Sequence, residues 1–85
     1  MRESEVVAFL RYPSKPLVDF ALTLANLPWQ EEQAINLCGR KRMTQEQAAE
    51  HLDRSVDAVQ KWYRSGIKSL QVAWSDCDWI RKVIS

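Results

Sequence analysis

The clearest hydrophobic pattern in the chain consists of two amphipathic segments between residues 44 and 70. The first, residues 45–52, places small and apolar side chains on one helical face: Ala48, Ala49 and Leu52. The second carries a longer apolar stripe, which consists of Val56, Val59, Tyr63, Ile67 and Leu70. About three residues separate the two segments, as in a helix-turn-helix. The pattern therefore predicts two helices joined by a tight turn.

Polar and small residues support these boundaries. Thr44 begins a capping box, in which its hydroxyl accepts from the Gln47 backbone N–H and the Gln47 side chain bonds back. Ser55 is a favourable N-cap for the second helix. Ala49 provides a small side chain where two steeply crossing helices approach each other.

Three further helices are predicted on the N-terminal side of this pair. Residues Glu3–Arg11 form the first, before the prolines at 13 and 16. The second begins after Ser14 and ends near Asn26, and the third runs from Pro28 to Cys38 with Gly39 as its C-terminal cap. Their expected buried positions are, in order, Val6, Val7 and Leu10; Leu17, Phe20, Ala21 and Leu24; and Ala34, Ile35, Leu37 and Cys38.

After Leu70 the second helix of the pair is expected to continue towards Trp74. A last helix, Asp76–Ile84, is predicted behind a second capping box at Ser75–Asp78. No strand-like alternation occurs. The predicted fold is all-α, a small bundle of five or six helices that contains a helix-turn-helix.

The length of 85 residues fits a single small domain, and an apolar share of 46% with four Trp is ample for a helical core. We divide this domain into N-terminal helices (1–26), a helix-turn-helix unit (27–70) and a C-terminal helix (71–85). The two cysteines form no metal or disulfide pattern, which is typical of a reducing cytoplasm. We expect no signal peptide and no membrane-spanning segment.

Charge is unevenly distributed, although the net charge is only +1. Residues 1–39 hold three basic and five acidic side chains, whereas residues 40–68 hold seven basic and four acidic ones. The excess positive charge therefore lies on the helix-turn-helix unit, as phosphate binding requires. A solvated loop would also explain the basic run at 40–42.

Candidate catalytic chemistry is sparse. His51 is the single histidine and lies inside a predicted helix, and there is no phosphate loop or nucleophile elbow. We therefore expect no enzyme activity, cofactor or metal.

The stretch from Leu27 to Leu70 resembles region four of bacterial sigma factors of the sigma-seventy class, without a gap. The matching residues are Leu27, Pro28, Glu31, Ala34, Ile35, Leu37, Met43, Thr44, Glu46, Ala49, Leu52, Ser55, Val56 and Val59. The resemblance implies a DNA-binding protein whose second helix, Val56–Leu70, enters the major groove. It also implies contact with RNA polymerase.

With the apolar stripe facing inward, Asp57, Gln60 and Lys61 face outward, and the resemblance places base reading at these three positions. Gln60 suits adenine, Lys61 suits guanine and Asp57 suits cytosine. The candidate phosphate contacts are Thr44, Arg54, Ser55, Arg64, Lys68, Arg40, Lys41 and Arg42.

Two departures from the family concern the turn. Asp53 replaces a Gly whose φ is positive, and Asp tolerates that conformation better than most residues. Arg54 replaces an apolar residue and adds a charge where phosphate could lie. A promoter-melting domain has no room in 85 residues, so we do not expect a complete sigma factor.

Several alternatives stay open. The fold could serve as a protein-interaction module for RNA polymerase or a sigma factor, or mark a DNA site for a phage or mobile element as a small terminase subunit does. Trp62 is expected to be half-buried. Trp74 and Trp79 could pack on the first two helices or enter a homodimer.

Overall fold

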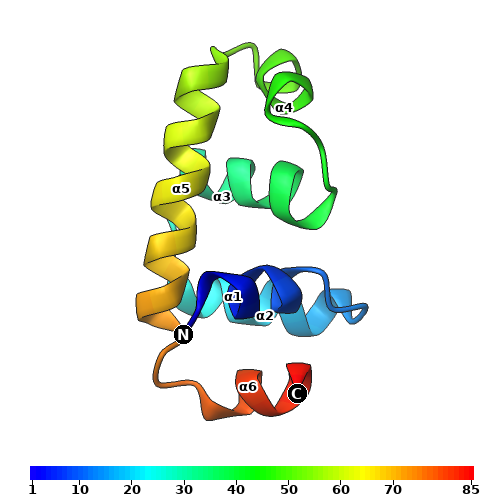
Figure 1. Ribbon diagram of the computed structural model, residues 1–85, viewed down its shortest axis with the longest axis vertical. Helices are drawn as coiled ribbons and strands as arrows, with labels where there is room; N and C mark the ends of the chain where they lie inside the picture. Colours follow the sequence, from blue (N-terminus) through cyan, green and yellow to red (C-terminus); the bar gives the residue numbers. More distant parts are fainter.

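Helix α5 (Val56–Ala73) is the longest element, and four other helices pack against it (Figure 1). The computed structural model describes all 85 residues. The other elements are α1 (Glu3–Leu10), α2 (Lys15–Ala25), α3 (Trp29–Ala34), η1 (Ile35–Arg40), α4 (Gln45–Leu52) and α6 (Asp78–Ile84). All are helical, which confirms the predicted all-α bundle; η1 continues α3, so the helices number six.

The helix-turn-helix forms as predicted. Thr44 Oγ1 accepts from Gln47 N at 3.1 Å and Gln47 Oε1 accepts from Thr44 N at 2.9 Å, which confirms the capping box. Ser55 Oγ accepts from Ala58 N at 3.1 Å. Asp53 adopts the left-handed conformation, with φ 54° and ψ 48°, and ends α4. These bonds join residues within a few positions of each other, so local chemistry fixes both helix ends.

Two clusters of buried side chains lie along α5. The larger joins α1, α2, η1 and α6 to the C-terminal half of α5. The smaller lies between η1, α4 and the start of α5, and includes Ala49 and Val59. Tyr63 packs against both clusters, so it connects the helix-turn-helix to the rest of the core. Val56 was predicted to face the core with the rest of the α5 stripe, but it lies in the first turn of the helix and is 37% exposed.

The predicted cap at Gly39 is wrong. The third helix continues as a π-helix through Arg40, with Lys41 N donating to Asn36 O at 3.0 Å, and the left-handed residue that follows is Arg42 (φ 58°). Gly39 is buried inside this helix. A Cβ there would lie 3.0 Å from Leu10 Cδ1. Gly39 therefore allows close packing of the α1 end against η1.

The predicted buried face of α2 is also wrong in part. Phe20 and Leu24 are 56% and 53% exposed, whereas Val18, Ala21 and Leu22 are buried. Both stripes have helical spacing, and contacts distant in sequence select between them. The indole N–H of the buried Trp74 donates to Ala21 O at 3.0 Å, and this bond joins α2 to the C-terminal end of α5.

The chain ends differ from the prediction in four details. Phe9 of α1 is fully buried, although it was absent from the predicted stripe, and Val7 is only partly buried. Helix α6 begins at Asp78, two residues later than predicted, and its N-cap Cys77 makes no side-chain capping bond. The hydroxyl of Ser75 donates instead to Val72 O at 2.7 Å, so the second capping box does not form.

Both C-terminal tryptophans pack on the N-terminal helices. The Trp74 ring lies edge-on to Phe9, with centroids 5.1 Å apart, and Trp79 meets Phe9 at 5.9 Å and Phe20 at 6.2 Å. Trp62 is half-buried, as predicted. Trp74 is therefore a core residue, and its side chain has no exposed surface with which to contact a second subunit.

Gly66 gives a prediction about the packing of α5 on α3 and η1. A Cβ at this position would lie 2.9 Å from Cγ1 of the buried Ile35. We expect Gly66→Ala to destabilise the domain by about 1–2 kcal/mol, because overpacking costs about 1–3 kcal/mol and better helix propensity returns up to about 1 kcal/mol. Urea unfolding followed by circular dichroism measures this change.

Replacing the opposing side chain provides the control for Gly66→Ala. In an Ile35→Ala background the obstructing Cγ1 is absent, so Gly66→Ala should become stabilising. If Gly66→Ala has the same effect in both backgrounds, close packing against Ile35 is not the reason for the glycine.

Candidate nucleic-acid interface

A shallow groove of about 400 Å³ follows the outer face of α5 and is lined by this helix alone. Its residues are Asp57, Gln60, Lys61, Arg64, Ser65 and Lys68. Three cations and one carboxylate leave this surface with a formal charge of +2. The structure therefore places all three predicted base contacts and two predicted phosphate contacts on one exposed face.

A neighbouring groove brings in α4 and the start of α1. Gln45, the first residue of α4, lines it together with Gln60, Arg64 and Lys68. Glu3 of α1 lies at the same groove. Sequence reasoning did not single out Gln45, although its place directly after the N-cap Thr44 was a usable signal, because first-turn residues of both helices commonly face the duplex.

The turn and helix starts supply the remaining predicted phosphate contacts. Thr44 and Ser55 are exposed, and their hydroxyls already accept from backbone N–H groups. Arg54 is exposed and donates to Asp53 O at 3.3 Å. Lys41 and Arg42 are also exposed, in the loop before α4. These positions stay compatible with phosphate binding.

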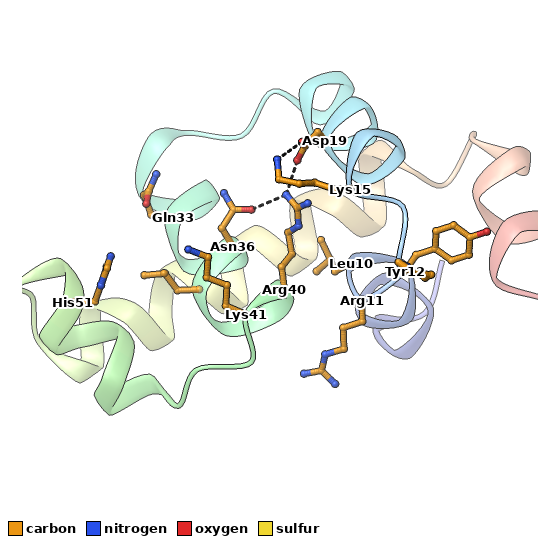
Figure 2. Close-up of a pocket in the computed structure, with 12 residues that line it drawn as sticks. Leu10, Arg11, Tyr12, Lys15, Asp19, Gln33, Asn36, Arg40, Lys41 and His51 are labelled. Atoms are coloured by element: carbon orange, nitrogen blue, oxygen red, sulfur yellow. Dashed lines mark hydrogen bonds and ion pairs between the residues drawn. The ribbon is translucent and has the colours of Figure 1, made fainter.

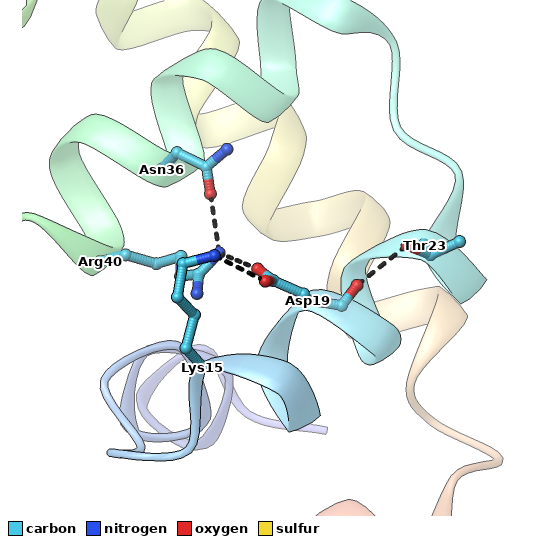
Figure 3. Close-up of polar contacts among 5 residues, drawn as sticks. All are labelled: Lys15, Asp19, Thr23, Asn36 and Arg40. Atoms are coloured by element: carbon cyan, nitrogen blue, oxygen red, sulfur yellow. Dashed lines mark hydrogen bonds and ion pairs between the residues drawn. The ribbon is translucent and has the colours of Figure 1, made fainter.

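Arg40 is occupied elsewhere, which corrects its predicted role. Its Nη1 lies 2.7 Å from Asp19 Oδ1 and 3.3 Å from Asn36 Oδ1 (Figure 3). The side chain is only 19% exposed. Lys15 also donates to Asp19, at 2.9 Å. Arg40 therefore ties η1 to α2, and we remove it from the candidate phosphate contacts.

The hydrogen bond from Lys15, and then that from Arg40, hold the pKa of the Asp19 carboxyl below its ordinary value of 3.8. A lowered folded pKa contributes stability above the unfolded pKa, and this contribution is lost as the pH falls through the folded value. We expect Asp19→Asn to melt below the wild type at neutral pH. This gap in melting temperature between the variant and the wild type should begin to close below about pH 3.8 and vanish in stronger acid.

The control for this pH dependence is Asp76→Asn, which removes an exposed aspartate that forms no ion pair. Thermal melts of the three proteins across the acid range test the expectation. A gap for Asp19→Asn that stays constant into strong acid would show that the ion pairs do not cause it.

No group of three His, Cys, Asp or Glu side chains is placed to hold a metal ion. Burial raises the pKa of the Cys38 thiol above its ordinary value, so this residue is a core side chain rather than a reactive thiol. None of the helices combines the length and apolar character needed to cross a membrane.

A capped helix-turn-helix whose second helix carries exposed amide and cationic side chains defines a helix-turn-helix domain of the DNA-binding type. The family model described as sigma-70, region 4 matches residues 17–70, and the chain belongs to this family. No curated protein and no solved structure matches the chain. The match covers α2 to α5 up to Leu70, and α1 and α6 lie outside it.

Proposed function

We propose that the protein is a sequence-specific DNA-binding transcriptional regulator of bacterial, phage or mobile-element origin. The observation that carries the proposal is the α5 groove, in which Gln60 and Lys61 stand one turn ahead of Arg64 on an exposed helix face. In this arrangement the N-terminal half of α5 enters the major groove of double-stranded DNA. Such a protein works in the cytoplasm, on the nucleoid.

The side chains suggest a division of roles along α5. Near its N-terminus, Gln60 can bond adenine with donor and acceptor together, and Lys61 can donate to guanine. Asp57 can accept from cytosine and repels phosphate, which discourages binding to other sequences. Further along, Arg64 and Lys68 are placed for the phosphate backbone.

A second group of phosphate contacts comes from the other side of the turn. Thr44 and Ser55 begin helices, where backbone N–H groups and the helix dipole favour an anion. Arg54, Lys41 and Arg42 add three exposed cations around them. We propose that these five residues hold the two strands on either side of the groove that α5 enters.

The test is selection from mixed genomic DNA fragments at increasing salt, with sequencing of the fragments that stay bound. We expect recovery of one or a few sites, with an affinity that falls steeply with salt because bound counterions are released. Absence of binding even at low salt would overturn the proposal.

One observation favours a second function, binding to RNA polymerase or a sigma factor. Large apolar side chains stay exposed at α2 and at the start of α3, namely Phe20, Leu24 and Trp29, the last of which is 63% exposed. Solvent-exposed aromatic side chains are enriched at protein interfaces. A pull-down of polymerase that persists after nuclease treatment, with no measurable DNA affinity, would support this function over the first.

A further inference from the structure

A second charged cleft, of about 560 Å³, lies among α1, α2, α3, η1 and α4, and α5 contributes no residue to it (Figure 2). Its basic and acidic lining residues are Arg11, Lys15, Asp19, Arg40, Lys41 and His51. Four permanent cations and one carboxylate give it a formal charge of +3 with neutral His51, which exceeds that of the α5 groove. The volume falls within the range of about 300–1,000 Å³ that is typical of ligand sites.

Only part of this charge is used inside the domain. Asp19 pairs with Lys15 and Arg40, and so neutralises one of them. Arg11 donates through Nε to Gly39 O at 3.1 Å, which leaves its terminal nitrogens without a bond to the protein. Lys41 takes part in none of the three ion pairs. Arg11 and Lys41 therefore lie at this cleft without an ion pair inside the domain.

The positions of these cations indicate the shape of a ligand. In Figure 2, Lys41 lies on the side of His51, Arg40 and Lys15 lie near Asp19, and the Arg11 head group points away from Arg40. A compact phosphate needs several donors that converge on one point. Spaced cations instead suit a chain with several separated carboxylates. Leu10, Leu37 and Tyr12 add apolar and aromatic surface to the same cleft.

We propose that this cleft binds an acidic peptide segment of a partner protein, on a surface separate from the DNA-reading helix. The charge complementarity is direct, since the free cations of Arg11 and Lys41 lack carboxylates within the domain. Because α5 lines no part of the cleft, an acidic segment bound there leaves the DNA-reading helix uncovered. This inference goes beyond DNA binding and does not depend on it.

The test uses the full chain and a fluorescein-labelled oligoglutamate peptide, with an oligoglutamine peptide of equal length as the neutral control. Fluorescence anisotropy measures binding of each at low salt. The cleft variant is Arg11→Gln with Lys15→Gln, which keeps the proposed phosphate contact Lys41. The matched variant Arg64→Gln with Lys68→Gln removes the same charge from α5. Arg11→Gln alone is a third protein, because Arg11 is exposed and forms no ion pair.

We expect the wild type to prefer oligoglutamate, and the cleft variant to bind it about threefold to tenfold more weakly, in line with the modest energy of exposed ion pairs. The α5 variant should bind the peptide like the wild type, and Arg11→Gln should show a part of the loss. Binding of a DNA duplex should be weakened by the α5 variant alone.

Three results would overturn the proposal. Equal losses of peptide affinity in the cleft and α5 variants would mean that peptide binding depends on the total charge of the protein and not on the cleft. Weaker DNA binding by the cleft variant would make the cleft part of the DNA footprint. Binding of ATP or inorganic phosphate that depends on Arg11 and Lys15, without peptide binding, would assign the cleft to small anions. Peptide binding by a protein that binds no DNA would instead overturn the proposed regulator and leave this inference standing.

Discussion

Replacement of Trp74 by Ala is expected to cost about 3–5 kcal/mol of unfolding free energy, the largest effect of any single change discussed for this protein. The side chain is 1% exposed and is the largest of the fully buried ones. Its loss leaves a cavity beside Phe9 and removes the bond from the indole N–H to Ala21 O. The total free energy of unfolding of a native protein is only about 5–15 kcal/mol, so this variant is close to unfolding.

Denaturant unfolding followed by far-ultraviolet circular dichroism gives the free energy without relying on tryptophan fluorescence. Trp74→Phe should cost less, because it retains most of the ring volume and loses chiefly the hydrogen bond. Trp29→Ala is the matched control, since Trp29 is exposed at the start of α3 and its loss should change stability by about 0.5 kcal/mol or less. Equal effects of Trp74→Ala and Trp29→Ala would contradict the packing described for the C-terminal end of α5.

The second large effect concerns DNA binding. We expect Gln60→Ala and Lys61→Ala each to weaken binding to the selected site by about 1–3 kcal/mol, and to change binding to unrelated duplexes far less. Arg64→Ala and Lys68→Ala should weaken both kinds of binding. Each should also reduce the dependence of log affinity on log salt by about one unit, because each removes one phosphate contact.

Anisotropy titrations of the selected duplex and a shuffled duplex, at several salt concentrations, separate these two classes of contact. Lys82→Ala removes a cation from α6, at the opposite end of the domain from α4 in Figure 1, and serves as the control for Lys61→Ala. Wild-type affinity of Gln60→Ala and Lys61→Ala for the selected site would mean that this face of α5 does not read bases.

The α5 groove could be predicted from the sequence, whereas the larger cleft could not. The α5 groove consists of residues from one helix, so the period of the apolar stripe was enough to place Asp57, Gln60 and Lys61 together on the outer face. The larger cleft collects residues from α1, the loop after it, α2, α3 with its continuation η1, and α4. Its charge was visible in the sequence only as scattered Arg and Lys residues, because their proximity depends on how four helices pack.

The sequence by itself determined the helix-turn-helix. The caps at Thr44 and Ser55 and the left-handed Asp53 depend on bonds between residues at most five positions apart, and the α5 stripe depends on helical period alone. Interactions of this kind depend only on residues that are close together in the sequence, so a short stretch of the chain is enough to predict them. The all-α class, with five or six helices, followed from the same signals repeated along the chain.

Only the tertiary structure decided the rest, because the deciding contacts join residues distant in sequence. Helix α2 carries two apolar stripes that share Ala21, and packing against helices distant in sequence buries Val18 and Leu22 rather than Phe20 and Leu24. Gly39 looked like a helix end, yet the helix continues through it as η1, and Leu10 Cδ1 lies only 3.0 Å from the place where its Cβ would be. Arg40 looked free for DNA until Asp19, 21 residues earlier, was placed beside it. The helical period determines on which face of its helix a residue lies, but it does not determine which other element packs against that face.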